Sequence, residues 1–154
     1  KTEIRQMKYS NEKAAHTIQH VNQNVLQPKE ELTRDLKTLL EKQDFSDCIL
    51  VCNDEKYQAH KCILASRSEA LKKLLENYQY TSRNFSPVNI ELNDIDSKIM
   101  PFVLNYIYTA ETDNKINDKN VKEIMKVADR LELGDLRKAC LAFMETRINK
   151  KTVI

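Results

Sequence analysis

The chain has 154 residues, 25 of them Lys or Arg and 23 Asp or Glu, which gives a formal net charge of +2 at pH 7. This length allows one domain with a real core and an appended arm. The balanced, unclustered charge argues against a nucleic-acid-binding protein. The sequence shows no apolar run of membrane-spanning length and no signal peptide, which predicts an intracellular protein of the nucleus or cytoplasm without a membrane partner. The first residue is not Met, which suggests a piece of a longer protein.

Residues 1–27 are polar but carry one stripe at alternating steps of three and four residues. This is the a/d pattern of a coiled coil, with Asn11 at an a position, where a buried amide would favour a parallel pair. Leucine is absent from the stripe, and the e and g positions lack complementary charges. The segment is therefore either a short coiled-coil helix or a linker from an upstream domain. The stripe residues are Ile4, Met7, Asn11, Ala14, Ile18, Val21 and Val25.

A second helix is expected to begin at Pro28, since proline suits the first helical position and Glu30 and Glu31 would then face the positive end of the helix dipole. Four leucines share one face of this predicted helix. A stripe this apolar must be covered, either by the domain's own core or by another surface. Its members are Leu32, Leu36, Leu39 and Leu40.

The rest of the chain is organised around residues 45–75. Residues 48–52 form a continuous apolar run that predicts a buried strand, and the alternation in 55–59 predicts the return arm of a hairpin. After His60 the apolar period changes to 3.6, which predicts two short helices interrupted at 66–68.

Downstream, residues 77–87 are rich in Ser, Thr and Asn and predict a loop, and 88–92 alternate as a third strand. A helix regular from about Lys98 should follow, with Pro101 inside it. Three features predict the last two helices: Asn120 with Glu123 as a capping box, Gly134 as a left-handed C-cap, and a closing helix over 136–148. In that closing helix we expect five buried residues, namely Leu136, Ala139, Cys140, Phe143 and Met144.

Four cysteines are present, and none belongs to a Cys-x-x-Cys pair; they are Cys48, Cys52, Cys62 and Cys140. The simplest interpretation is four reduced thiols without metal or cofactor. A zinc site made of Cys48, Cys52, His60 and Cys62 is the sharper alternative, but its spacing matches no structural zinc pattern. A Cys/His nucleophile pair would need a third group that orients the histidine and hydrogen-bond donors that form an oxyanion hole. Neither can be assigned in this sequence, so we expect no enzyme activity. His60 then becomes a hairpin-end residue that is hydrogen-bonded to backbone.

Three separated blocks resemble the opening motif of the BTB/POZ domain, and especially its speckle-type (MATH-BTB) branch. They are Phe45-Ser46-Asp47, Ala59-His60-Lys61 and the run from Ile63 to Ser68. The similarity continues through residues 88–92, 106–109, 128–131 and 136–140, so that it covers Asp44 to Ile148.

The resemblance implies an α+β fold, with a small three-stranded sheet packed by five to six helices and an N-terminal helical extension. It also implies a homodimer in which Leu32, Leu36, Leu39 and Leu40 form the interface and Asp47 pairs with Lys61 near the dimer floor. The expected organisation is residues 1–27 as linker or coiled coil, 28–148 as the BTB/POZ domain, and 149–154 as the start of a truncated C-terminal extension.

For the speckle-type branch the implied role is an adaptor that joins a substrate-recruiting domain, absent from this chain, to a cullin-3 ubiquitin ligase. The cullin's N-terminal domain would dock on a face that includes residues 95–119 and a hydrophobic-x-Glu motif. Here the motif positions read Gln79-Tyr80-Thr81, so the apolar anchor and the carboxylate are both missing and weaker binding is expected. The residues expected to face the cullin are Tyr78, Gln79, Tyr80, Thr81, Tyr108 and Thr109. The alternatives are a co-repressor-recruiting module of a transcriptional regulator and a dimerisation scaffold that does not bind cullin.

Overall fold

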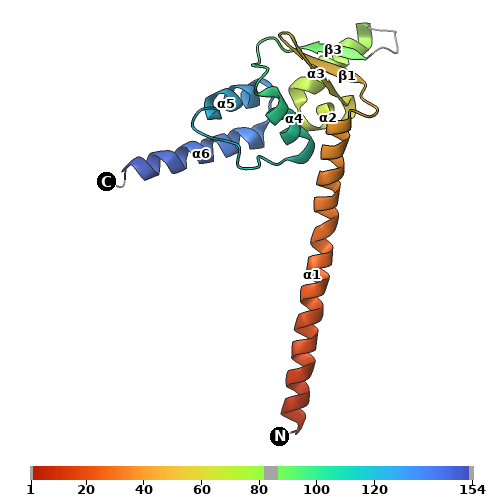
Figure 1. The fold of residues 1–154 in the computed structure, drawn as a ribbon, viewed down its shortest axis with the longest axis vertical. Helices are drawn as coiled ribbons and strands as arrows, with labels where there is room; N and C mark the ends of the chain where they lie inside the picture. The colour runs from red at the N-terminus through yellow and green to blue at the C-terminus, as the bar shows by residue number, and fades with distance from the viewer. Residues whose placement is uncertain (1, 82–86, 153–154) are drawn as a thin grey trace. The chain divides into compact units, whose positions relative to one another are not determined.

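The computed structural model describes the backbone of residues 2–81 and 87–152, and the side chains of 6–13, 28–78 and 87–149. The chain divides into two compact units, residues 1–36 and 37–154. The fold is α+β with a three-stranded sheet, as the sequence predicts (Figure 1). The described elements are α1 (Thr2–Lys42), β1 (Cys48–Cys52), β2 (Glu55–Ala59), α2 (Lys61–Arg67), α3 (Glu69–Thr81), β3 (Val88–Glu91), α4 (Met100–Thr109), α5 (Val121–Arg130) and α6 (Gly134–Thr152).

Helix α1 runs through Pro28 without interruption, so the expected helix start at that residue is wrong. An interior proline costs about 3 kcal/mol of helix stability, which shows that the residues on both sides favour the helix strongly enough to tolerate it. Two members of the expected coiled-coil stripe, Met7 and Asn11, are exposed, and the side chains of Ala14 to Val25 lie outside the described ones. No helix in the described part of the chain is both long and apolar enough to cross a membrane.

The sheet has the order β2-β1-β3, with β1 antiparallel to β2 and parallel to β3. Leu50 at the centre pairs with Tyr57 on one side and Ile90 on the other. A central strand covered on both faces requires apolar residues at consecutive positions, which explains why residues 48–52 read as an unbroken apolar run. In the two edge strands, β2 and β3, every exposed position holds a polar or charged residue.

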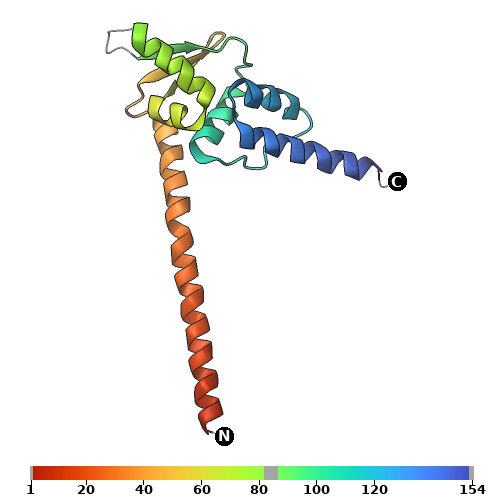
Figure 2. The same ribbon diagram turned by 180° about the vertical axis from the view of Figure 1, so that it is seen from behind.

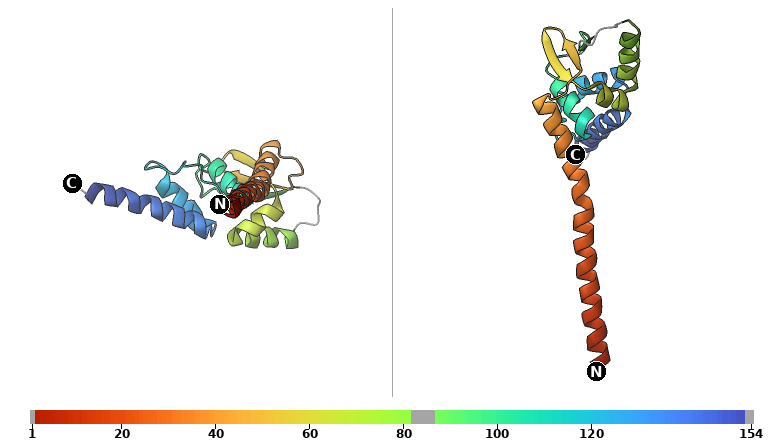
Figure 3. Two further views of the ribbon diagram at one scale, coloured as in Figure 1. Left: turned by 90° about the horizontal axis from the view of Figure 1, so that it is seen from below. Right: turned by 90° about the vertical axis from the view of Figure 1, so that its right-hand side faces the viewer.

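Within residues 37–154, α2 packs with α3, and α5 packs with α6. Figures 1 and 2 show α4 between these two helix pairs, and Figure 3 shows the α5–α6 pair from below. The buried apolar side chains come from the sheet and from every one of these helices. The largest of them are Leu50, Leu64, Leu71, Ile90, Leu92, Met100, Ile107, Ile124, Leu131 and Leu136.

The end of α2 is tied by polar contacts to two other helices. Arg67 Nε donates a hydrogen bond of 3.0 Å to the Ile107 carbonyl in α4. The buried Ser68 Oγ donates a bond of 2.6 Å to the Leu131 carbonyl after α5, and it accepts one of 3.1 Å from the Leu71 N–H. Ser68 therefore caps the first turn of α3 and fixes that turn against the end of α5.

The buried His60 joins three parts of the fold. Its Nε2 lies 2.7 Å from the Asp44 carbonyl oxygen, and its Nδ1 lies 2.6 Å from the Tyr108 hydroxyl at the end of α4. A carbonyl only accepts, so Nε2 carries the proton. The Tyr108 hydroxyl accepts from the His60 backbone N–H at 3.0 Å and donates its own proton to Nδ1. The expected backbone hydrogen bond of His60 is confirmed, and Tyr108 is an additional partner.

Helix α4 begins at Met100, two residues later than predicted, which places Pro101 in the first turn. A proline is tolerated there because its missing N–H would have no helical partner. The preceding residues form turns instead, and one of these turns is closed by the Asp96 carboxylate accepting from the Lys98 N–H at 2.9 Å.

The predicted N-cap and C-cap of α5 are wrong in detail. Asn120 is the N-cap of α5, but its side chain makes no capping bond to the helix. The left-handed residue after α5 is Glu132, with φ of 54°, because the Leu133 N–H reaches back 2.8 Å to the Ala128 carbonyl in a Schellman arrangement. Gly134 is the first residue of α6 rather than a cap.

Two further predictions need correction. Helix α3 continues to Thr81, so residues 77–81 are helical rather than part of a loop. In α6, Leu136 and Cys140 are buried as expected, but Ala139, Phe143 and Met144 are only half-buried.

We expect Tyr108→Phe to lower the free energy of unfolding by about 1–3 kcal/mol, because it leaves the buried His60 N–H and Nδ1 without their partner. Tyr57→Phe is the control, since its half-buried hydroxyl makes one bond of 2.8 Å to the Ser97 carbonyl and should cost about 0.5–1.5 kcal/mol. Urea unfolding at one fixed protein concentration measures both. A Tyr108→Phe variant as stable as the parent would contradict the contact.

Candidate interaction surfaces

The leucine stripe, Leu32, Leu36, Leu39 and Leu40, occupies the second half of α1. Leu32 is 60% exposed, and the other three are half-buried. The single chain thus leaves apolar surface uncovered along this stripe. Burial of apolar area is worth about 25 cal/mol per Å², so this surface favours association with another apolar surface.

Asp47 and Lys61 are in contact, but not as the expected charged pair. Asp47 Oδ1 accepts a hydrogen bond of 2.8 Å from the backbone N–H of Lys61, the first residue of α2. Asp47 is exposed, and Lys61 is half-buried. Within the chain, the carboxylate therefore satisfies an unpaired N–H at the start of α2 and meets the positive end of that helix.

Tyr108 and Thr109 were expected to face a cullin, but both are buried in the chain. The Tyr108 hydroxyl is engaged with His60, and burial raises the pKa of this hydroxyl above its usual range, so it stays protonated as a donor. The Thr109 hydroxyl donates to the Asn105 carbonyl at 2.7 Å and accepts from the Glu111 N–H at 3.1 Å. Both residues shape the end of α4, and a contact of either one with a cullin stays a prediction.

The positions of the missing hydrophobic-x-Glu motif lie in the last turn of α3. Tyr78 is half-buried there, and the side chains of Gln79, Tyr80 and Thr81 lie outside the described ones. A role of these four residues in binding a cullin stays a prediction.

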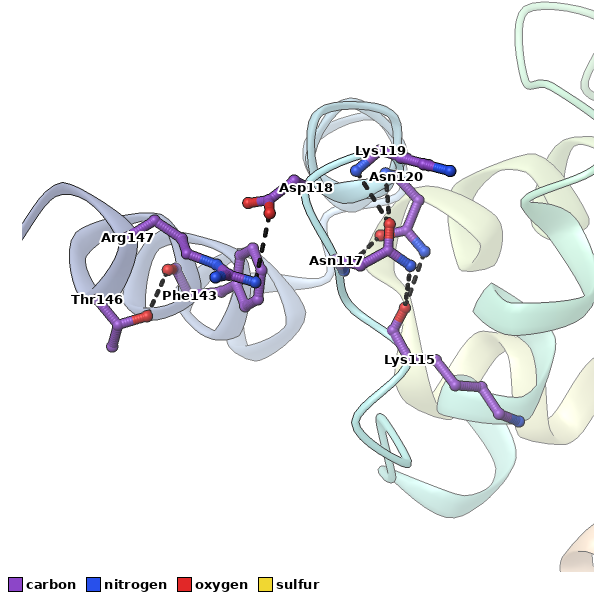
Figure 4. Close-up of polar contacts among 8 residues, drawn as sticks. All are labelled: Lys115, Asn117, Asp118, Lys119, Asn120, Phe143, Thr146 and Arg147. Atoms are coloured by element: carbon purple, nitrogen blue, oxygen red, sulfur yellow. Dashed lines mark hydrogen bonds and ion pairs between the residues drawn. The ribbon is translucent and has the colours of Figure 1, made fainter. Parts of the chain in front are cut away.

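The connection between α4 and α5 is held by a compact amide network (Figure 4). The backbone N–H of Asn117 donates to Asn120 Oδ1 at 2.8 Å, and the backbone N–H of Asn120 donates to Asn117 Oδ1 at 3.2 Å. Both side-chain amides also donate to the Lys115 carbonyl, at 3.2 and 2.8 Å. The backbone over residues 115–120 is thereby fixed, which lowers the entropic cost of binding a partner there.

Figure 4 also shows how this connection contacts α6. Arg147 lies 3.3 Å from the Asp118 carboxylate, and its guanidinium carbon is 5.2 Å from the ring centre of Phe143. An exposed ion pair contributes only about 0–1 kcal/mol, so it orients the connection more than it stabilises the fold. Sequence reasoning missed both the amide network and this contact; two Asn residues three apart just before a helix are the signal that could have suggested the network.

The cysteines are not arranged as the zinc site that the sequence offered as an alternative. Cys48 and Cys52 lie at the two ends of β1, and at about 3.3 Å per residue their Cα atoms are roughly 13 Å apart, too far to share one tetrahedral ion with sulfur ligands at about 2.3 Å. Both ring nitrogens of His60 are already hydrogen-bonded. Among the described residues, no group of three or more His, Cys, Asp or Glu side chains is placed to hold a metal ion.

The family model of the BTB/POZ domain matches residues 36–148. This range, together with the fold described above, shows that the chain belongs to the BTB/POZ family, a protein-interaction fold. The solved structure of the BTB domain of human gigaxonin is similar to this chain, with a TM-score of 0.61 and 29% sequence identity. The match covers 74% of this chain and 91% of the gigaxonin chain.

Two kinds of curated relatives are similar to this chain. Kelch-like protein 41a of Danio rerio is 28% identical over 74% of this chain, and TD and POZ domain-containing protein 5 of Mus musculus is 29% identical over 79% of it. The matched region spans 19% of the first relative and 35% of the second. Since both kinds match at similar identity, the closer resemblance to the speckle-type branch stays a prediction.

Only Cys62 should react with a thiol reagent in the folded protein at pH 8. Cys62 is exposed, whereas burial raises the pKa of the thiols of Cys48 to about 12 and of Cys52 to about 11, and also raises that of Cys140. Only thiolates react, so the buried cysteines lack both the reactive form and access. Spectrophotometric thiol titration should give one fast equivalent in the native protein, none in Cys62→Ser, and all the remaining thiols in denaturant. A second fast thiol in the native parent would contradict this.

Proposed function

We propose that this chain is the homodimeric adaptor module of a cullin-3 ubiquitin ligase, acting in the cytoplasm or nucleus. A domain outside this sequence would recruit the substrate, and the module itself would bind the cullin's N-terminal domain. The proposal rests chiefly on a BTB/POZ fold whose leucine stripe remains uncovered in the single chain.

Homodimerisation is supported by the position and composition of the leucine stripe. An obligate interface resembles a domain core cut in half, and it needs a continuous apolar surface of this kind. A second copy of the chain covers the stripe in the simplest way, because one self-complementary surface then serves both subunits.

Cullin binding is supported by the fixed connection between α4 and α5. The network of Asn117 and Asn120 presents this segment in one conformation, and its exposed residues Lys115, Asp118 and Lys119 offer charges of both signs. The last turn of α3 would supply the second contact. There, Tyr78 or Tyr80 would replace the missing apolar anchor, since a tyrosine buries a large ring and keeps its hydroxyl in water.

Light scattering should give the parent chain a mass twice its 18.0 kDa. Leu39→Asp combined with Leu40→Asp should give a monomer, because two carboxylates in an apolar interface would cost roughly 3 kcal/mol or more, which is over a hundredfold in Kd. Ile148→Asp is the control, since Ile148 is 63% exposed on α6 and lies outside the stripe. Circular dichroism checks that each variant is folded. A parent that is monomeric at micromolar concentration would refute the dimer.

Calorimetry against the cullin-3 N-terminal domain tests the adaptor role. We expect measurable but weak binding by the parent, and Gln79→Met combined with Thr81→Glu should tighten Kd by roughly thirtyfold, equivalent to about 2 kcal/mol. Lys56→Glu is the control, because it adds a carboxylate on the exposed strand β2 and should change nothing.

Two outcomes would contradict this account. Tight binding by the parent with no gain from the double variant would show that the hydrophobic-x-Glu motif is dispensable for binding here. An absence of binding by either protein would identify a dimerisation scaffold outside the ligase pathway.

A further inference from the structure

Phe45 lies in the turn between α1 and β1, and 92% of its surface is exposed. The other large hydrophobic residues that stand out as exposed in the described part have values from 60% to 72%. Single exposed apolar residues are common and need no explanation by themselves. Phe45 differs because its backbone is also held in an unfavourable conformation.

The φ angle of Phe45 is 60°, in the left-handed region. Glycine, asparagine and aspartate enter this region at low cost, whereas a bulky side chain there is a genuine outlier. Phe45 is the one aromatic residue among the described non-glycine residues with positive φ; the others are Gln43, Asn53, Ala110, Asp113, Asn114 and Glu132. Such strain persists only where the surroundings fix the backbone, and it concentrates at functional positions.

The residues on both sides of Phe45 supply that fixation. The Asp44 carbonyl accepts from His60 Nε2 at 2.7 Å. Ser46 Oγ donates to Gln58 Oε1 at 2.8 Å, and the Asp47 N–H donates to the Ala59 carbonyl at 3.1 Å. Three hydrogen bonds, from residues on both sides of Phe45, therefore hold the turn to the end of the β1–β2 hairpin, while the Phe45 ring is left in solvent.

We propose that Phe45 is an anchor of the homodimer, with its ring buried against the second copy of this chain. This inference rests on the homodimer of the proposed function and adds a specific residue to it. The turn follows the leucine stripe directly in the chain, and the Gln43 N–H donates 3.0 Å back to the Leu39 carbonyl at the end of α1. Aromatic residues on a rigid backbone make the strongest anchors, and a two-fold interface uses each anchor twice.

Phe45→Gly is the decisive variant, because glycine removes the ring and accepts the left-handed backbone. Sedimentation equilibrium should show a dimer Kd weakened by roughly tenfold or more, with the circular dichroism of the parent retained. Gln43→Gly is the matched control. This substitution relieves the strain of a left-handed residue, with φ of 59°, in the same turn without removing an apolar side chain. The dimer Kd of the Gln43→Gly variant should therefore equal that of the parent.

A second measurement reports burial directly. The sequence contains no Trp, so Phe45→Trp introduces a single tryptophan, which can be excited selectively in the presence of the six tyrosines. Its emission should shift to shorter wavelength as the concentration rises through the dimer Kd, whereas that of Ile148→Trp should not change. A dimeric parent with no effect of Phe45→Gly and no shift for Phe45→Trp would overturn the anchor alone. A monomeric parent would overturn both the anchor and the homodimer.

Discussion

The hydrogen bonds of His60 are the constraint on which the arrangement of this domain depends. One imidazole joins the turn after α1, through the Asp44 carbonyl, to the end of α4, through the Tyr108 hydroxyl. The same residue ends the β1–β2 hairpin and precedes α2. Polar groups buried without partners are costly, so His60 and Tyr108 stabilise the fold only in the one geometry that satisfies them all.

The interaction surfaces follow from this constraint. The turn that carries Phe45 is held through Asp44, and Asp47 is held between the Ala59 carbonyl and the Lys61 N–H. At the end of α2, the hydrogen bonds of Arg67 and Ser68 fix α2 and α3 against α4 and the end of α5. Residues 59–61 thus fix the turn next to the proposed dimer surface, whereas the connection between α4 and α5 in the proposed cullin surface is fixed by its own network of Asn117 and Asn120. Rigid presentation of this kind favours binding because less entropy is lost on association.

Much of the fold could be predicted because its elements carry strong local patterns. The strand at 48–52, the hairpin and the 3.6-residue period of the later helices lie where periodicity placed them. The errors arise where a local signal is outweighed either by its neighbours along the chain or by contacts that are distant in sequence. Pro28 reads as a helix start but lies inside α1, and Glu132 takes the left-handed position that Gly134 was expected to fill. Tyr108 could not be recognised as buried, because its partner His60 is 48 residues away in sequence. The exposure and strain of Phe45 likewise appear only in the structure.

The most direct test of this account is the tautomer of His60, read from the ¹⁵N shifts of its ring nitrogens and their couplings to ring protons in the folded protein. The chain has three histidines, so His16→Gln combined with His20→Gln leaves the signals of His60 alone. The account predicts a protonated Nε2 and an unprotonated, hydrogen-bonded Nδ1, with the Nδ1 signal shifting in Tyr108→Phe. A proton on Nδ1 with a bare Nε2, or rapid exchange between the two tautomers, would contradict it.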